Sequence, residues 1–440
     1  MKKYIPCLVF LLQWSIVNCQ LSIAQQPIPA KPQEKAILLL NGNAHLGNGT
    51  VIPKSAIAFD KGKITLVSDA DKLSMDKSVY EVIDVTGKEI YPGLIAPNTI
   101  MGMCEIELVR STNDFYETGS MNPNVRSIIS YNTDSKVTPT VRSNGVLISQ
   151  IVPQGGTISG LSSVVELDGW NWEDVVYKTD DGIHLNWPRM YIQHGWWAEP
   201  EDVQRSNTEK EIQKIRAFFT DAQAYSASTP SEKNLRFEAM RGLFTSRVSS
   251  GNTLKKLFIH TGYVKEMISA VNFSKEFGLK MVLVGAADAW MITDFLKENE
   301  VAVILGRTHT LPSRDDEDVD MPYKTPYLLQ KAGVNFCLSV DGFWQVRNLP
   351  FMAGTAAANG LSKEEALMSI TSNTAKILGI ESTCGTLETG KDATLFISSG
   401  DALDMKTNNV ELAFIRGKQI DLKNVQTALN KKFRDKYGLK

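Results

Sequence analysis

The sequence predicts an α/β protein in which a (β/α)8 TIM-like barrel is joined to a small β-sandwich domain formed from both ends of the chain. Three observations predict this fold. Short strand patterns open the chain, apolar strands alternate with helical patterns through its middle, and strand patterns return near its end. Strands that alternate with helices are typical of parallel βαβ units, and enough of them over roughly 250 residues close into a barrel.

Composition is that of an ordinary globular protein. The chain has 440 residues, of which 43% are hydrophobic and 22% charged, and its formal net charge is −2. This length allows two or three domains, or one large barrel with an appended domain. Nucleic-acid-binding proteins normally carry a basic face, so a nucleic-acid partner is not expected.

The first 24 residues are expected to be an export signal. Two lysines precede an apolar run that is too short for a comfortable membrane span, and Ser22 and Ala24 supply the small residues of a cleavage site. Cleavage after Ala24 predicts a periplasmic or extracellular protein with no membrane span after processing. Two alternatives are an uncleaved anchor and lipid attachment through Cys19.

The β domain is expected in two parts, residues 36–93 and residues 381–425. Residues 25–35 are polar and proline-rich and are interpreted as a linker, and residues 426–440 as a C-terminal tail. Tight hairpin turns are predicted at Lys61-Gly62 and at Arg416-Gly417.

The barrel is expected over residues 94–380. Its predicted strands are 146–152, 256–260, 280–284, 301–305 and 335–340, and its predicted helices include 264–277 and 289–298. Ser362 and Glu365 form a capping-box pattern that opens a further helix. The tryptophan-rich segment, residues 170–231, is interpreted as an insertion over the barrel mouth, and no fourth barrel strand can be placed in it.

The most specific motif lies near the end of the chain. Its residues are Thr371, Asn373, Ala375, Leu378 and Gly379, followed by Gly385, Leu387, Gly390, Lys391 and Ala393. This pattern resembles the closing segment of the amidohydrolase superfamily, and the imidazolonepropionase-like branch is the most similar. Residues 82–88 before Pro92-Gly93 fit the same resemblance. It implies a barrel with an appended β domain, but activity depends on the site.

The resemblance also implies a divalent-metal site at the carboxyl ends of the barrel strands. Family members typically have two histidines on strand 1, a carboxylated Lys or a Glu on strand 4, one His each on strands 5 and 6, and an Asp on strand 8. Here the strand-1 positions read Ala96-Pro97-Asn98-Thr99-Ile100, and strand 6 ends in Val284-Gly285-Ala286. His260 matches the strand-5 ligand. Asp341 matches the strand-8 aspartate, which would be both metal ligand and catalytic base.

A catalytic zinc site usually has three protein ligands, so other histidines are candidates to complete a reduced site. His309 follows the predicted strand 301–305 and is expected near the barrel mouth as a third ligand. His184 and His194 lie in the tryptophan-rich segment, and His45 is expected to be structural. The expected cofactor is therefore one divalent metal, zinc, iron or manganese, or none.

Three functions remain open. The first is an exported amidohydrolase-type hydrolase that cleaves carbon–nitrogen bonds, such as those of a cyclic amide, with a reduced metal site. The second is a catalytically inactive pseudoenzyme that binds a ligand or serves as the partner of an active relative. The third is a carbohydrate-binding protein that uses the tryptophans, whose rings suit such contacts. A small-molecule substrate or ligand is expected, and a homo-oligomer is also open.

Overall fold

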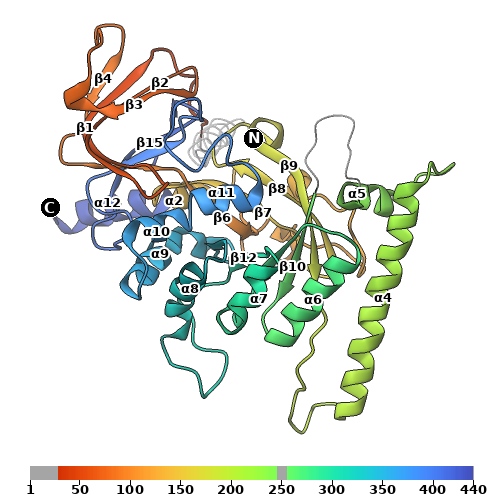
Figure 1. Cartoon of the computed structure of the whole chain (residues 1–440). Helices are drawn as coiled ribbons and strands as arrows, with labels where there is room; N and C mark the ends of the chain where they lie inside the picture. The colour runs from red at the N-terminus through yellow and green to blue at the C-terminus, as the bar shows by residue number, and fades with distance from the viewer. Residues whose placement is uncertain (1–27, 245–254, 440) are drawn as a thin grey trace, which may run out of the picture.

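A computed structural model describes residues 28–244 and 255–439. The predicted signal segment, residues 1–24, lies outside the described residues. Two eight-stranded sheets form the framework, and Figure 1 shows one of them as a separate layer beside the helix-covered barrel. This architecture confirms the predicted fold class. In the described part of the chain, no helix is long and apolar enough to cross a bilayer.

The first sheet combines strands from both ends of the chain. Its order is β16-β15-β14-β5-β1-β2-β3, with β4 paired to β1. The strands are β1 (Ile37–His45), β2 (Val51–Asp60), β3 (Lys63–Asp69), β4 (Glu81–Asp84), β5 (Glu89–Pro92), β14 (Leu395–Ser398), β15 (Val410–Ile415) and β16 (Lys418–Gln419). Antiparallel pairing of β5 with β14 joins the two ends. Across the sheet, the rings of Phe59 and Phe414 pack with centroids 5.0 Å apart.

Both predicted hairpin turns are present. Lys61-Gly62 joins β2 to β3 and has φ values of 47° and 79°, and Arg416-Gly417 joins β15 to β16 with φ values of 45° and 72°. Two consecutive positive φ angles are typical of a type I′ turn, whose twist suits antiparallel strands. A Cβ at Gly62 would lie 3.0 Å from the carbonyl oxygen of Arg416. The two turns therefore lie directly against each other.

The second sheet is a nearly closed barrel with the order β13-β12-β11-β10-β9-β8-β7-β6. Its strands are β6 (Leu94–Thr99), β7 (Val146–Ile151), β8 (Ile158–Glu166), β9 (Val176–Asn186), β10 (Lys256–Thr261), β11 (Met281–Gly285), β12 (Ala302–Leu305) and β13 (Phe336–Leu338). β8 runs antiparallel to both of its neighbours. This differs from the parallel βαβ units that the sequence predicted, because residues 152–157 between β7 and β8 are too few for a helical crossover.

The gap between the first and last barrel strands is bridged by the backbone of Ser369 and Ile370. The Ile95 N–H donates to the Ile370 carbonyl at 2.9 Å, and the Leu338 N–H donates to the Ser369 carbonyl at 3.0 Å. The helix that follows, α11 (Ser372–Leu378), packs its apolar residues into the same buried cluster as the interior side chains of the barrel strands. Its last carbonyls accept hydrogen bonds from lysines near the amino ends of β9 and β10. α11 therefore fills the amino end of the barrel.

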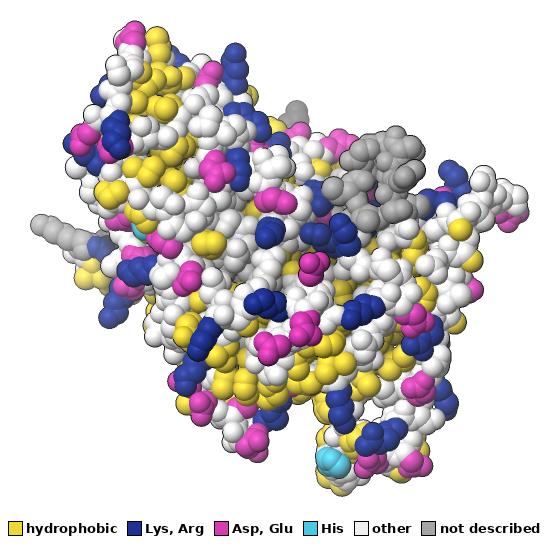
Figure 2. All heavy atoms as spheres, in the orientation of Figure 1, with side chains coloured by type: hydrophobic (Ala, Val, Ile, Leu, Met, Phe, Trp, Pro, Cys, Tyr) yellow, Lys and Arg dark blue, Asp and Glu magenta, His cyan; other side chains and the backbone are white. Residues whose placement is uncertain are grey.

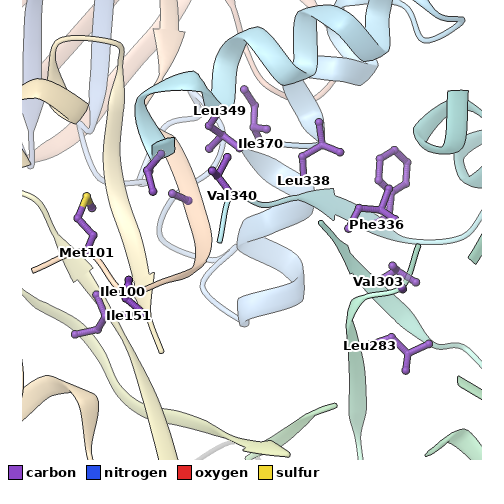
Figure 3. Close-up of a cluster of buried hydrophobic side chains, with 14 of the residues drawn as sticks. Ile100, Met101, Ile151, Leu283, Val303, Phe336, Leu338, Val340, Leu349 and Ile370 are labelled. Atoms are coloured by element: carbon purple, nitrogen blue, oxygen red, sulfur yellow. The ribbon is translucent and has the colours of Figure 1, made fainter. Parts of the chain in front are cut away.

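Helices cover most of the outside of the barrel. They are α2 (Val137–Arg142), α3 (Trp172–Val175), α4 (Glu201–Ala227), α5 (Leu235–Phe244), α6 (Val264–Glu276), α7 (Thr293–Glu298), α8 (Met321–Ala332), α9 (Leu349–Ala358) and α10 (Lys363–Met368), with α12 (Val425–Tyr437) near the end of the chain. Apolar side chains such as Leu283, Val303 and Phe336 come from adjacent strands and belong to the largest buried cluster (Figure 3). Charged side chains of both signs are intermixed on the face drawn in Figure 2.

The barrel strand that the sequence could not place is β9, which lies within the tryptophan-rich segment. Its first residues are mostly polar, so the apolar pattern of a buried strand appears only from Ile183 to Leu185. α4 follows it and has its buried residues, Ile212, Ile215, Phe219 and Ala222, in its middle and carboxyl-terminal half. The amino-terminal end of α4 extends beyond the barrel (Figure 1). The segment is thus a barrel strand followed by a protruding helix.

Candidate functional site

A cavity of about 730 Å³ opens at the carboxyl ends of the barrel strands. Asn98 of β6, Asn186 of β9, His260 of β10 and Asp341 after β13 line it. Ser159 of β8 also lines it, because the reversed direction of β8 brings the amino end of this strand to the mouth. Barrel enzymes place their functional residues at this end, and the volume suits a small organic molecule.

Asn98 occupies the strand-1 end, where the resemblance implied a histidine. Its φ is 55°, a left-handed conformation that Asn tolerates better than most residues. The Asn98 N–H donates to Gln150 Oε1 at 3.1 Å, and Gln150 Nε2 donates to Asp181 Oδ2 at 3.0 Å. Asp181 is buried and also accepts from Ser162 Oγ at 2.5 Å. This buried network holds the backbone of Asn98, whose side chain brings an amide, rather than an imidazole, to the cavity wall.

His260 is paired with a second histidine. Its Nε2 lies 2.8 Å from Nδ1 of His184, which is fully buried and stacked on Phe258 with ring centroids 4.7 Å apart. Burial lowers the pKa of His260 to about 4. Burial, followed by the charge of His260, lowers the pKa of His184. Both rings are therefore neutral at neutral pH, and one N–H of the pair donates to the lone pair of the other. Nδ1 of His260 has no hydrogen-bond partner in residues 28–244 and 255–439.

Asp341 is paired with a cation of the protein itself. Its Oδ1 lies 3.1 Å from Nε of Arg307, and the two side chains are 60% and 44% exposed. Both residues line the cavity. An ion pair with this exposure contributes little to stability and opens easily, so it positions two opposite charges at the mouth without fixing the fold.

The other histidine candidates lie elsewhere. His309 is not among the described residues that line the cavity, and its Nε2 lies 2.7 Å from Oγ1 of Thr355 on α9. His194 is exposed in the loop between β9 and α4. The structure therefore brings His260 and Asp341 to one cavity, adds His184 behind His260, and places His309 and His194 away from that cavity.

The donors at the strand ends do not fit the divalent-metal centre that the resemblance implied. Within the described ranges, no group of three or more His, Cys, Asp or Glu side chains is arranged to hold a metal ion. Residues 245–254 contain none of these four residue types. Asn98 and Ala286 stand at the strand-1 and strand-6 positions, and His184 engages Nε2 of His260. A metal bound by His260, Asp341 and His309 stays a prediction that this geometry does not favour.

Arg307 and Trp290 line the cavity but were not predicted from the sequence, because the predicted site was built mainly from histidines. Arg307 comes directly after β12, and its place at the end of a barrel strand was a signal that could have found it. Trp290 follows β11, and its Nε1 is buried without a hydrogen-bond partner in the part of the chain that the structure describes. Among the tryptophans with described positions, Trp290 lines this cavity and those of the tryptophan-rich segment do not.

Comparisons with known proteins agree with the fold. An amidohydrolase from Thermotoga maritima MSB8 superposes with a TM-score of 0.73 at 22% identity, over 88% of this chain and 99% of that one. A prolidase solved with N-methylphosphonate-L-proline superposes with a TM-score of 0.54 at 16% identity, over 88% of this chain and 100% of that one. Molinate hydrolase superposes with a TM-score of 0.51 at 13% identity, over 89% and 95%. At these identities the likeness concerns the fold alone.

Sequence comparisons match part of the chain to amidohydrolases. Amidohydrolase tasK of Hapsidospora irregularis is 31% identical over 114 residues, which are 24% of this chain and only 12% of that relative. The sequence model of the Amidohydrolase family matches residues 323–420, which run from α8 to the first residue after β16 and contain the closing motif. These matches support a hydrolase. Part of this chain is therefore similar in sequence to the Amidohydrolase family, and its barrel and separate sheet are similar in fold to solved amidohydrolases.

Proposed function

We propose that this chain is a ligand-binding member of a hydrolase family, and that its barrel-mouth cavity holds a small polar molecule without the divalent-metal centre of the family. One observation carries the proposal. The two side chains that match family ligands are both engaged by the protein, His260 by His184 at 2.8 Å and Asp341 by Arg307 at 3.1 Å. Asn98 and Ala286, at the strand-1 and strand-6 positions, bind metals poorly or not at all, and His184 on β9 is paired with His260.

The cavity offers hydrogen bonds and apolar contact. Neutral His260 presents one ring nitrogen, and Asn98 and Ser339 add an amide and a hydroxyl. Trp290 and Leu305 provide apolar surface in the same cavity. A few polar groups among apolar walls are typical of sites that orient a small molecule. This is the pseudoenzyme function among the three that the sequence left open.

A second candidate is hydrolysis of a carbon–nitrogen bond at a reduced metal site. It is favoured by the finding that His260 and Asp341 line the same cavity and that Nδ1 of His260 has no partner among the described residues. Carbohydrate binding is less supported, because Trp196 and Trp197 are 98% and 58% exposed in a loop that does not line the cavity. Export through residues 1–24 and the imidazolonepropionase-like branch are further proposals.

Elemental analysis separates the first two functions. We expect protein purified without chelator to contain substoichiometric zinc, iron and manganese, and its Tm to stay unchanged in EDTA. His260→Ala should not change the metal content, and His309→Ala is the matched control because His309 contacts Thr355 rather than the cavity. Stoichiometric metal that disappears in His260→Ala but persists in His309→Ala would overturn the proposal and support the reduced hydrolase. Loss of the metal in both variants would support the predicted metal site of His260, Asp341 and His309.

A further inference from the structure

A second groove, of about 760 Å³, lies where the first sheet meets the amino end of the barrel. One wall includes Lys178 near the start of β9 and Gly379 directly after α11, so the groove is at the opposite end of the barrel from the cavity described above. The turns β2–β3 and β15–β16 form the other wall. Among its described lining residues are one carboxylate, Asp392, and five cations. The cations are Lys61, Lys63, Lys178, Arg416 and Lys418.

The two hairpin turns, which with the residues that follow them carry four of these cations, are fixed against the rest of the protein. The Gly62 N–H donates to Gln33 Oε1 at 3.1 Å, and Gln33 Nε2 donates to the Phe59 carbonyl at 3.0 Å. The Gly417 N–H donates to the Ala393 carbonyl at 2.9 Å, and the Ala393 N–H donates to the Gly62 carbonyl at 2.8 Å. The cations therefore start from fixed backbone positions, and a ligand would order little of the main chain.

The protein balances only part of this positive charge. Lys63 pairs with Asp392 at 2.6 Å, and Arg416 pairs with Glu166 at 2.6 Å. Burial raises the pKa of Glu166 to about 7, so this carboxyl is only partly ionised at neutral pH. Lys178 Nζ donates at 2.7 Å to a main-chain carbonyl at the end of α11, which carries no formal charge. The groove therefore keeps an excess of positive charge.

Lys61 and Lys418 are the cations of the groove that have no partner. Within residues 28–244 and 255–439, neither ammonium group makes a hydrogen bond or an ion pair. They belong to the two adjacent hairpins and line the same groove. Like charges gathered in one groove repel each other and attract an anion, which would relieve the repulsion.

We propose that this groove binds a small molecule that carries two or more phosphate groups, and that Lys61 and Lys418 contact those groups. A lysine ammonium is a compact point charge with three donors, which suits phosphate oxygens. More than one phosphate is expected because the cations come from two hairpins and from β9, and the volume is that of a small-molecule site. The inference concerns the amino end of the barrel and does not depend on the function proposed for its mouth.

Calorimetric titration with inorganic pyrophosphate tests the inference. We expect the wild-type protein to bind one pyrophosphate per chain, and the double variant Lys61→Gln/Lys418→Gln to bind it about tenfold more weakly. The matched control is Lys77→Gln/Lys265→Gln, which makes the same change in net charge at two exposed lysines outside the groove and should bind as the wild type does. Circular dichroism and Tm of each variant verify that it is folded.

Three further comparisons locate the site and define its ligand. Arg307→Gln, which removes a cation of the barrel-mouth cavity, should leave the binding of pyrophosphate unchanged. Citrate, whose charges are carboxylates, should bind more weakly than pyrophosphate. ADP carries the diphosphate on a nucleoside: tighter binding of pyrophosphate than of ADP indicates an inorganic diphosphate, and the reverse indicates a diphosphate ester. Either order supports the phosphate site.

Five results would overturn the inference. They are no binding of pyrophosphate, an unchanged affinity in Lys61→Gln/Lys418→Gln, an equal loss in the control variant, loss of binding in Arg307→Gln, and citrate binding as tight as that of pyrophosphate. Because Lys61 and Lys418 have no partner among the described residues, their substitution removes charge from the groove without breaking a contact of the fold.

Discussion

At the scale of single residues, His45 connects the β sheet to the barrel. Its Nε2 lies 3.0 Å from Glu89 Oε2 on β5, and its Nδ1 lies 2.6 Å from Glu364 Oε1 on α10. Its ring also stacks on Tyr91 with centroids 4.5 Å apart. Burial alone would lower the pKa of His45, but hydrogen bonds and charge from Glu364 and Glu89 outweigh burial and raise it. The sequence predicted a structural role for His45 but gave no sign of these partners.

The contacts of His45 with Glu89 and Glu364 should make the stability of the protein depend on pH. Because the folded pKa of His45 is raised, its contribution is fully present below the unfolded value near 6.5 and is lost as the pH rises through the folded pKa. We expect a loss on the order of 1–2 kcal/mol across that window. His45→Gln should show a correspondingly smaller change in Tm between pH 6 and pH 8.5. An identical pH profile in wild type and variant would contradict the assignment.

At the scale of elements, the capping box of α10 was predicted and is confirmed. Ser362 Oγ accepts from the Glu365 N–H at 3.2 Å, and Glu365 Oε2 accepts from the Ser362 N–H at 2.8 Å. These bonds satisfy backbone donors that the first turn leaves free. The residues just after α10, Ser369 and Ile370, bridge the open seam of the barrel. The cap therefore fixes the start of the segment that closes the barrel.

Loss of this cap should be measurable. Ser362→Ala is expected to destabilise the protein by about 1 kcal/mol, which lowers the Tm by about 1–2 °C. Ser362→Asp, whose carboxylate can accept the same N–H, should retain most of the stability. Differential scanning calorimetry of the three proteins provides the comparison. A Tm of Ser362→Ala equal to that of wild type would show that the cap does not limit stability.

At the scale of the whole molecule, an ion pair ties the β sheet to the barrel. Arg416, in the turn between β15 and β16, places Nε 2.6 Å from Glu166 Oε1 at the end of β8. Burial raises the pKa of Glu166 to about 7, although Arg416 opposes this rise. Because the unfolded pKa is near 4.3, the folded protein holds the proton more tightly, and stability falls as the pH rises from about 4.3 to about 7.

Substitution of Arg416 should increase the loss of stability that occurs as the pH rises. Arg416→Met leaves the ionised Glu166 without its nearest cation, so we expect destabilisation on the order of 1–2 kcal/mol at pH 8.5 and less at pH 6, where the carboxyl takes up a proton. Lys418→Met is the matched control, since Lys418 exerts a smaller influence on Glu166. Glu166→Gln in the same chain should remove the pH dependence. Equal destabilisation at both pH values would contradict this coupling.

The sequence predicted those features of the fold that depend on residues close together in the chain. Apolar strands, the two Gly-containing hairpin turns and the capping box depend on neighbouring residues, and the structure contains them. β9 was missed because the polar residues 178–181 interrupt its apolar pattern. His260 and Asp341 were placed at strand ends and do line one cavity. The pairing of His260 with His184, and of Asp341 with Arg307, arises from register between strands far apart in sequence, which periodicity does not reveal.

The reversed strand β8 has a consequence for how the chain reaches its native state. β7, β8 and β9 pair with their neighbours along the chain, so few residues must be ordered before these contacts form. The remaining barrel strands pair in parallel across longer connections, which cost more loop-closure entropy and form more slowly. We therefore expect this three-stranded meander to be the earliest nucleus of the barrel, with the seam at Ser369 and Ile370 among the last contacts to form.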